Sequence, residues 1–376
     1  MEPLPPRRHL PGRIRLYAGY QHSIAAYGTA WTETRMNFCK RELAVLALLG
    51  SIIPSAVTAQ GMEVSYPQRQ LTLVIGFPPG GGADALARLF ARHMAAELGQ
   101  NVIVDYRPGA AGNIGAKSVA RTQADGYTIY LGGRPNTIHK AIYPQLDYDF
   151  SRDLMPVGLV ATMPYVVVVG KDTPIASVQD IVAIAKAYPS TPTCASAGVG
   201  TSDHLLCVMF QQETGTEIAH VPYRGSAQAF ADVMGGRVDM HFAPLPAALP
   251  QIVAGNLRAI AVMSATRVVG LPHTPTIAEA GFPGLALDAW YGLMAPTGTP
   301  QAAVRRLNQS INAVLAKPEL QEALDQLAYV PPSPDTPEAF GALIAEETDR
   351  WMKVLRQRKI VTDPADGAAV PPSPVP

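Results

Sequence analysis

Short apolar runs alternate with glycine-rich turns and amphipathic stretches along most of the chain. The first run, Leu71–Ile75, is rich in apolar and β-branched residues, which is typical of a buried strand. Residues 77–82 follow with two prolines, which disfavour a helix, and three glycines, which allow unusual backbone angles. From Asp84, apolar residues recur at helical spacing as far as Leu98. This pattern predicts a strand, a tight turn and a helix.

The same succession continues through the chain. It predicts helices up to Ala120, at Val178–Ala187, near residues 202–215 and up to Met234, and strands at residues 101–106, 127–131, 157–160, 165–169, 193–197, 217–222, 238–243, 257–264 and 290–294. The first three strands end in loops rich in Gly, Asn and Thr. Because ligands bind at the carboxyl ends of strands in open α/β sheets, we expect these loops to line one site.

Two similar α/β lobes that face each other are the simplest architecture for this pattern. The strand at 165–169 is the candidate crossing into the second lobe, and the strand at 290–294 returns to the first. Three C-terminal helices are predicted to start near Pro300, Pro318 and Pro337. We expect the first and the last of them to brace the lobes through the apolar residues Val304, Leu307, Ile311 and Leu315, and Phe340, Leu343, Ile344, Trp351 and Leu355.

The composition and the N-terminal sequence indicate the class of the protein and its location in the cell. With 376 residues and 48% apolar content the chain is long enough for two domains, and its formal net charge of 0 argues against a nucleic-acid or anionic-membrane partner. After Met36 come a basic pair, an apolar run at residues 43–53 and a small-x-small ending at Ala59. These parts predict a signal peptide over residues 36–59, cleaved after Ala59, and hence a periplasmic protein.

The two ends of the chain carry further expectations. Residues 1–35 precede the predicted signal peptide, so we interpret them as a disordered extension from an upstream start codon. The proline-rich residues 362–376 are predicted to be a disordered tail.

Two cysteines, Cys194 and Cys207, remain after the predicted signal peptide. In an oxidising compartment they form either a disulfide or two buried free thiols, and their spacing does not decide between the two. His204 lies three residues before Cys207, but a zinc site needs more ligands than this stretch supplies. No metal site is predicted.

The first glycine-rich turn has three interpretations. A helix start presents free N–H groups and the positive end of the helix dipole, which suits the carboxylate of a solute. In the second interpretation the turn binds no ligand and only connects the strand to the helix. In the third it binds a dinucleotide, because Gly80-x-Gly82-x-x-Ala85 with Asp105 matches the dinucleotide fingerprint. We favour the solute, because two prolines crowd the turn and an exported protein meets little nicotinamide cofactor. A phosphate-binding P-loop is excluded, since no Lys-Ser/Thr pair follows the glycines.

The sequence offers little for catalysis. Ser202, Asp203 and His204 are adjacent, whereas a catalytic triad needs groups that converge from separate segments. Asp203 either favours its helix dipole or pairs with a ligand amine. Arg134 either pairs with a carboxylate or faces solvent. We therefore predict no catalytic residue, no cofactor and no enzyme.

A series of motifs together resembles the substrate-binding proteins of tripartite tricarboxylate transporters, the Bug or TctC-like family. The motifs are FPPGGGAD (77–84), RPGAAGNIG (107–115), SAGVGTSDHL (196–205), HVPYRG (220–225), PTIAEAG (275–281) and WYGLMAP (290–296). The resemblance extends from about residue 66 to 360. It implies an α/β fold of the two-lobed periplasmic binding protein type (type II, Venus flytrap) with two hinge crossings. We place lobe 1 at residues 60–164 and 286–361, and lobe 2 at residues 165–285.

The resemblance also implies which residues contact the solute. In lobe 1 they are Phe77, Gly81, Gly82, Ala83, Asp84, Asn113 and Asn136, and in lobe 2 Ser196, Gly200, Thr201, Ser202, His204, Tyr223 and Ala243. Three departures from the family pattern affect the ligand: Ala111 replaces a glycine, residues 132–135 lack hydroxyls, and Asp203 replaces a small residue. We add Arg134 and Asp203 to the site, because a pair between them would favour an amino acid or latch the closed form.

By resemblance, the protein captures a small carboxylate, namely a di- or tricarboxylate, an acidic amino acid or an aromatic acid. It then delivers the solute, as a monomer, to integral membrane transporter subunits. A ligand sensor for a signalling partner and an exported enzyme that uses the same cleft are the alternatives. One geometric expectation tests the site: Gly81 and Thr201 should lie in a shared crevice.

Overall fold

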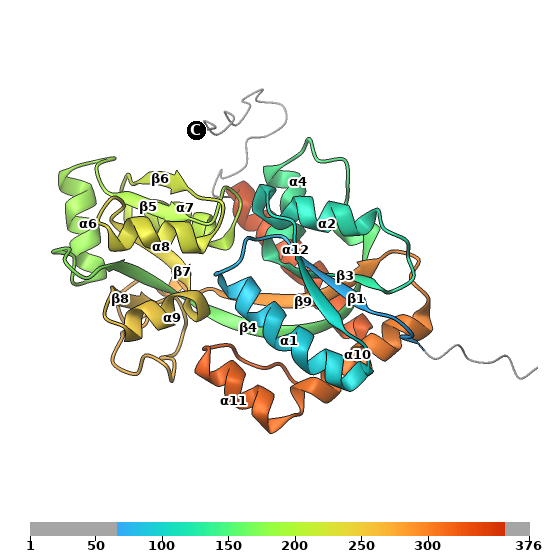
Figure 1. Ribbon diagram of the computed structural model, residues 1–376. Coiled ribbons are helices and arrows are strands. Elements are labelled where there is room, and N and C mark those ends of the chain that lie inside the picture. The colour runs from blue at the N-terminus through green and yellow to red at the C-terminus, as the bar shows by residue number, and fades with distance from the viewer. Residues whose placement is uncertain (1–65, 358–376) are drawn as a thin grey trace, which may run out of the picture. The chain divides into compact units, whose positions relative to one another are not determined.

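The computed structural model describes residues 66–357, through which a nine-stranded sheet runs (Figure 1). The predicted extension at 1–35, the signal peptide at 36–59 with its cleavage after Ala59, and the tail at 362–376 lie outside the described residues. The strands are β1 (Leu71–Ile75), β2 (Val102–Tyr106), β3 (Thr128–Gly133), β4 (Leu154–Gly170), β5 (Thr193–Ser196), β6 (Ala219–Pro222), β7 (Met240–Pro244), β8 (Leu257–Val262) and β9 (Asp288–Pro296).

The sheet has two halves that share β4. Its order is β2-β1-β3-β9-β4-β7-β5-β6, with β8 paired to β4 off this path. β1 is parallel to β2 and β3, and β9 runs antiparallel between β3 and β4. We call β1, β2, β3, β9 and the first part of β4 lobe 1, and the rest of β4 with β5–β8 lobe 2. Figure 1 shows β4 and β9 running between the two groups of strands.

β4 corrects one expectation. The strands predicted at 157–160 and 165–169 form one continuous strand, Leu154–Gly170. Pro164 lies inside this strand, although proline cannot donate to a strand ladder. Pro164 is the last residue of β4 paired with β9, and Tyr165 is the first paired with β7. The proline therefore lies where the strand changes partner. The predicted lobe boundaries at 164/165 and 285/286 stay predictions.

Helices cover both faces of each half of the sheet. They are α1 (Gly82–Leu98), α2 (Asn113–Ala120), α3 (Arg134–Thr137), α4 (His139–Ile142), α5 (Phe150–Asp153), α6 (Val178–Ala187), α7 (Ser202–Thr214), α8 (Ser226–Met234), α9 (Leu245–Val253), α10 (Gln301–Leu315), α11 (Pro318–Gln326) and α12 (Pro337–Gln357), with short 3-10 turns at Ala110–Gly112 and Pro283–Leu285. The helix at Val178–Ala187 has its predicted bounds, and Ser177 caps it by accepting from the Asp180 N–H.

The alternation of side chains along the strands explains how the faces are covered. In β1, Leu71, Leu73 and Ile75 share one core cluster with the buried face of α1, whereas Val74 faces the opposite way and packs with residues of α2. In lobe 2, Val167 and Val169 pack with α7, while Val166 and Val168 pack with α8 and α9. Both faces are buried, which explains the continuous apolar runs in the sequence.

The C-terminal helices pack as braces. Val304, Leu307, Ile311 and Leu315 of α10 are buried, as are Phe340, Ile344, Trp351 and Leu355 of α12, while Leu343 is half-buried. α10 lies alongside α1, and α12 packs on β4 (Figure 1). The helix α9 was not predicted, because Pro246 and Pro250 and a largely apolar sequence leave it without an amphipathic pattern. Its Pro246 occupies the first turn, where no N–H is needed.

Cys194 on β5 and Cys207 on α7 are free and buried, which corresponds to the second of the two alternatives. Burial, and then the neighbouring Cys207 thiol, raise the pKa of the Cys194 thiol. Within residues 66–357, no helix combines the length and apolar character needed to cross a bilayer.

Candidate functional site

A pocket lies between the two lobes, and Gly81 and Thr201 both line it, as expected. Its volume is about 720 Å³ when the part open to solvent is included. Of the predicted site residues, the lining contains Phe77, Gly81, Gly82, Ala83, Arg134, Asn136, Thr201, Ser202 and Asp203. It does not contain Asp84, Asn113, Ser196, Gly200, His204, Tyr223 or Ala243. Whether the lining residues bind a solute stays a prediction.

Lobe 1 supplies the start of α1. Gly81 is the N-cap and no side chain caps this end, so the first N–H groups of the helix remain available. Asp84 does not reach the pocket. Its carboxylate accepts from the Gly80 N–H at 2.8 Å, from the Tyr106 hydroxyl at 2.7 Å and from Arg88 at 2.6 Å. Asp84 therefore fixes the shape of the loop that precedes the helix.

Two backbone contacts hold this loop from behind. The Tyr329 hydroxyl donates to the Gly82 carbonyl at 2.6 Å. Gly76 lies so close to the second loop that a Cβ on it would be 2.3 Å from the Gly112 Cα. Only glycine allows such an approach. The first and second loops of lobe 1 therefore hold each other at main-chain distance.

Two buried asparagines connect the second and third loops. The Asn136 amide donates to the Asn113 side-chain oxygen at 3.0 Å and accepts from the Gly133 N–H at 3.1 Å. The Tyr130 hydroxyl donates to the Gly112 carbonyl at 2.9 Å, and burial raises its pKa. Asn136 lines the pocket, whereas Asn113 is fully buried behind it. Asn113 therefore positions the loops and does not line the pocket.

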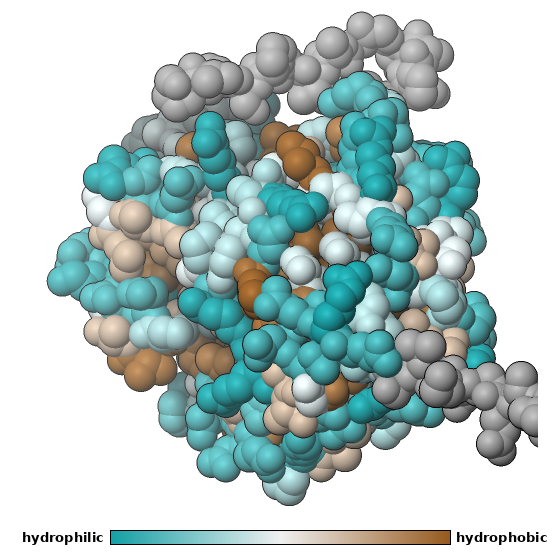
Figure 2. Space-filling view, turned by 45° about the vertical axis from the view of Figure 1, so that its right-hand side comes forward, coloured by the Kyte–Doolittle hydropathy of each residue, from teal (hydrophilic) through white to brown (hydrophobic). Residues whose placement is uncertain are grey.

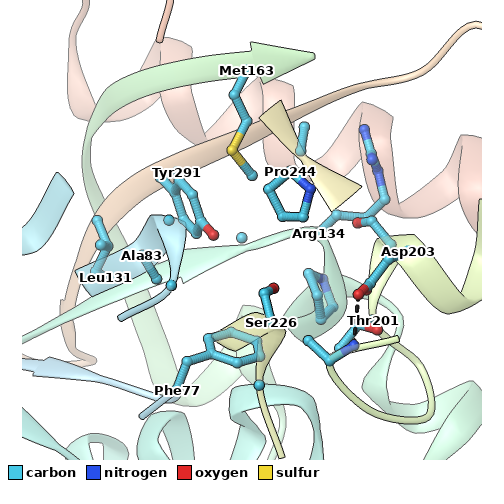
Figure 3. Close-up of a pocket in the computed structure, with 18 of the residues that line it drawn as sticks. Phe77, Ala83, Leu131, Arg134, Met163, Thr201, Asp203, Ser226, Pro244 and Tyr291 are labelled. Carbon is cyan, nitrogen blue, oxygen red and sulfur yellow. Dashed lines mark hydrogen bonds between the residues drawn. The ribbon is translucent and has the colours of Figure 1, made fainter. Parts of the chain in front are cut away.

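Arg134 is neither exposed nor paired with Asp203. It is 2% exposed, and its guanidinium donates to Glu347 at 3.1 Å and to the Asp288 carbonyl, and lies over the Trp351 ring at 4.7 Å. Burial lowers the pKa of Arg134 to about 10, so the side chain remains charged. In Figure 3 it lies at the edge of the pocket, away from Phe77 and Tyr291. The expected Arg134–Asp203 pair is thus replaced by Arg134–Glu347.

Lobe 2 supplies the start of α7, where Asp203 lines the pocket. Its Oδ2 accepts from the Ala197 N–H at 2.6 Å and lies 2.9 Å from Nε2 of His241. Burial acts to raise the pKa of Asp203, but the hydrogen bond and charge of His241, with Thr201 and the Ala197 N–H, outweigh it and lower the pKa. Asp203 is therefore an ionised carboxylate at the pocket wall.

Two polar residues that were predicted as contacts, Ser196 and His204, support this loop from outside the pocket together with His220. Ser196 Oγ lies 2.6 Å from Nε2 of His220, and the His220 ring is 4.3 Å from the ring of His204. Nδ1 of His204 accepts from the Gly200 N–H at 3.2 Å. Burial lowers the pKa of both histidines, to about 4 for His220. Because Ser196 is fully buried and does not line the pocket, the Ser–His pair has no access to a substrate there.

The start of α8 adds a third helix end. Gly225 is its N-cap without side-chain capping, and Gly225, Ser226 and Ala227 line the pocket. Figure 3 shows Ser226 in the middle of the site. The Tyr223 hydroxyl donates to Asp232 at 2.5 Å, which keeps Tyr223 out of the pocket, and Pro244 lines the wall in place of its neighbour Ala243.

The lobes also contact each other at the rim of the pocket. A Cβ placed on Gly225 would be 2.8 Å from Cγ of Pro78, and the Tyr143 hydroxyl donates to the Val199 carbonyl at 2.6 Å. Pro78 and Tyr143 belong to the lobe 1 part of the chain, and Val199 and Gly225 to lobe 2. The two lobes therefore touch at two places, of which the Pro78–Gly225 contact belongs to the pocket lining.

The crossing strands form the wall that sequence reasoning missed. Met163 and Tyr165 come from β4, and Trp290 and Tyr291 come from β9. Burial raises the pKa of Tyr291, so its hydroxyl remains a donor, and Figure 3 shows it pointing into the pocket. Tyr165 lies in a predicted apolar strand, whereas Trp290 and Tyr291 begin the WYGLMAP motif. Ser226 also had a signal, since it follows the glycine of the HVPYRG motif.

Together, α1, α7 and α8 direct three helix N-termini without side-chain caps at one pocket. Such ends attract anions through their N–H groups and dipoles. The charged residues of the lining are Arg134 and Asp203, each with a protein partner. Neutral donors, chiefly backbone N–H groups and hydroxyls, are thus the groups offered to an anion. Within residues 66–357, no cluster of three or more His, Cys, Asp or Glu is placed to hold a metal.

A two-lobed α/β fold with a small pocket between its lobes defines a solute-binding protein. The chain belongs to the TctC family, Tripartite tricarboxylate transporter family receptor, which matches residues 86–360. The protein is therefore a periplasmic solute-binding protein of a receptor family.

Relatives of known sequence support the family. The chain is 39% identical over 322 residues to the UPF0065 protein in the tcbD-tcbE intergenic region of Pseudomonas sp. (strain P51), covering 85% of this chain and 95% of that protein. It is 36% identical over 316 residues to Protein BugT of Bordetella pertussis, covering 83% and 97%.

Solved structures show the same fold. The periplasmic binding protein BugD is 32% identical with a TM-score of 0.76, covering 79% of this chain and 100% of that one. R. palustris Rpa4515 with adipate is 36% identical with a TM-score of 0.76, covering 78% and 98%. MatC (Rpa3494) from Rhodopseudomonas palustris with bound malate is 30% identical with a TM-score of 0.74, covering 77% and 100%.

Proposed function

We propose that this protein captures a small organic carboxylate between its lobes and delivers it to integral membrane subunits of a tripartite tricarboxylate-type transporter. The observation that carries the proposal is the convergence of uncapped helix N-termini from both lobes on one pocket. Two similar proteins have structures with adipate and malate, which supports a carboxylate ligand. Export through the predicted signal peptide, lobe boundaries at 164/165 and 285/286, and action as a monomer belong to this proposal.

The carboxylate is held at the start of α1. The N–H groups of residues 81–83 have no side-chain cap, and the hydroxyls of Ser226 and Tyr291 lie around the same space (Figure 3). Ser226 belongs to lobe 2, so an anion bound here bridges the lobes. A ligand that contacts both lobes stabilises the closed form by its differential affinity for that form.

The test is a thermal-stability screen against a panel of small carboxylic acids. A ligand that binds only the folded state stabilises it by RT ln(1 + L/Kd), where L is the free ligand concentration, so the unfolding temperature rises with the logarithm of ligand concentration above Kd. We expect at least one acid to stabilise the protein, and we expect mass spectrometry to recover that acid unchanged. Recovery of a chemically altered acid would favour the exported-enzyme alternative. No stabilisation by any carboxylate would refute the proposal.

Delivery is tested separately, by uptake. A strain that lacks this protein should lose import of the stabilising acid, and expression of the protein should restore it. Import that continues at the wild-type rate would argue against delivery and for the sensor alternative.

A further inference from the structure

Asp203 is the one charged side chain that stays at the pocket wall within the described part of the chain. The other charged residue of the lining, Arg134, is held at the edge by Glu347 and by the Asp288 carbonyl. Asp203 is 2% exposed, and its pairing group, His241, is completely buried behind it. A solute that fills the pocket therefore meets an ionised carboxylate on one side and no free cation.

Asp203 retains hydrogen-bonding capacity. A carboxylate offers about four acceptor positions. Oδ2 takes both the Ala197 N–H and the His241 contact. The neighbouring Thr201 hydroxyl donates to the Gly198 carbonyl at 2.6 Å and also helps to lower the pKa of Asp203, whereas both hydrogen bonds to Ala197 and His241 use Oδ2. Acceptor positions of Asp203 therefore remain for a donor from the ligand.

The anion-binding groups lie on the other side of the pocket. Figure 3 shows Asp203 and Thr201 on one side, Phe77, Ala83 and Tyr291 on the opposite side, and Ser226 between them. The start of α1 has its acidic residue, Asp84, turned away and paired with Arg88. The start of α7 has Asp203 in front of it. The two sides thus select groups of opposite charge.

We propose that the physiological ligand carries a single carboxylate and, at its other end, an ammonium group that pairs with Asp203. This inference rests on the proposed function and specifies its ligand as an amino acid whose two charges are separated by an apolar body. Met163 and Tyr165 supply an apolar and aromatic wall for that body. A second carboxylate in place of the ammonium would face Asp203, and two like charges in a buried site repel.

Isosteric ligand pairs test the inference by calorimetry on the purified wild-type protein. The pairs are 6-aminohexanoate against adipate, and 4-aminobutanoate against succinate. We expect the amino acid of at least one pair to bind about tenfold or more tightly than its diacid, because a close charge pair at a buried site is worth at least this factor. This comparison needs no variant.

The variant Asp203→Asn tests whether Asp203 causes the preference for the amino acid over the diacid. It keeps the shape of the side chain and removes its charge, so the ratio of the two affinities should fall by about tenfold. Asp172→Asn is the matched control, because Asp172 is 85% exposed beside Lys171 in lobe 2 and does not line the pocket. It should leave the ratio unchanged. A ratio that is the same in Asp203→Asn and wild type would overturn the role of Asp203.

Different experimental results would refute this inference and the proposed function. Tighter binding of the diacid in every pair would overturn the inference alone, as would binding of other carboxylates without binding of any amino acid in the series. If no carboxylate of any kind binds, the proposed function itself fails.

Discussion

The first loop of lobe 1 and the α7 loop of lobe 2 have the same local design and opposite electrostatics. In both, a strand ends in a glycine-rich loop, an uncapped helix follows, and an aspartate of its first turn accepts from a loop N–H. Asp84 is paired with a surface arginine, Arg88, and turned out of the pocket. Asp203 is paired with a buried histidine, His241, and lines the pocket.

The supports behind the loops differ in the same way. Lobe 1 uses side-chain amides, Asn113 and Asn136, whose hydrogen bonds do not change with pH. Lobe 2 uses imidazoles, His204 and His220, whose rings are tilted against each other behind its loop. The comparison shows that one backbone design is supported by neutral amides in one lobe, and in the other by titratable imidazoles beside an ionised aspartate.

The largest effect is expected where the loops of lobe 1 touch. In Gly76→Ala the new Cβ would lie 2.3 Å from the Gly112 backbone, so we expect a loss of about 3 kcal/mol or more of unfolding free energy. Gly81→Ala is the matched control, since no atom lies within 4 Å of its Cβ position, and it should cost less than about 1 kcal/mol. Urea unfolding measures both. Equal losses would contradict the close approach of the two loops.

The contact between the lobes gives the next effect. Gly225 has extended backbone at φ 175°, which any residue adopts, but its Cβ would meet Pro78 across the pocket. We expect Gly225→Ala to weaken ligand binding about 100-fold by opposing closure, with little change in unfolding temperature. The double variant Pro78→Ala/Gly225→Ala should restore much of the affinity. Unrescued binding in the double variant would mean that the lobes do not meet there.

Asp84 and Ser202 separate support from contact. Asp84→Ala leaves the Gly80 N–H and Tyr106 hydroxyl without their acceptor, so we expect a loss of about 2 kcal/mol and weaker binding through a loosened loop. Ser202→Ala lies in the pocket lining and should weaken binding at a stability cost below about 1 kcal/mol. Chemical denaturation and calorimetry measure the two quantities. Affinity unchanged in both variants would overturn the site.

A smaller effect is expected from pH. Burial, and then the nearby His204, hold the pKa of His220 at about 4, below its ordinary value of 6.5. The unfolded chain therefore binds the proton first, so stability falls as pH is lowered from about 6.5 towards about 4. His220→Gln removes this proton uptake and should flatten the decline. Urea unfolding at pH 4, 5, 6 and 7 tests it, and parallel curves for variant and wild type would refute the assignment.

The smallest effect concerns a strained residue of lobe 1. Ala111 has φ 52° and ψ 37°, a left-handed conformation that costs about 1 kcal/mol for a residue with a Cβ. Ala111→Gly should therefore stabilise the protein by up to about 1 kcal/mol. Ala116→Gly, within α2, should instead destabilise it by about 1 kcal/mol or more. The melting temperatures of both variants test this prediction. A lower melting temperature for Ala111→Gly than for the wild type would show that the backbone of Ala111 is not strained.

Patterns within short stretches of sequence predicted those parts of the site that a single stretch forms. The glycine-rich turns and the helix starts follow from chain-local signals, whereas the shared crevice of Gly81 and Thr201 followed from the two-lobed arrangement and the family resemblance. The aromatic wall was not predicted, because Tyr165 and Tyr291 belong to crossing strands whose placement depends on pairing between distant segments. The partner of Arg134 is 213 residues away on α12, a distance that no spacing rule spans. The continuity of β4 was missed for the same reason, since Pro164 is tolerated only because β4 changes partner there.

The uncapped helix starts have an evolutionary consequence. Main-chain donors are independent of the side chains attached to them, so substitutions around the pocket leave these N–H groups in place, and only proline deletes one. Substitutions at the aromatic wall or at position 203 can then change the shape and charge of the pocket while the main-chain donors persist. A single scaffold can in this way diversify into receptors for different solutes.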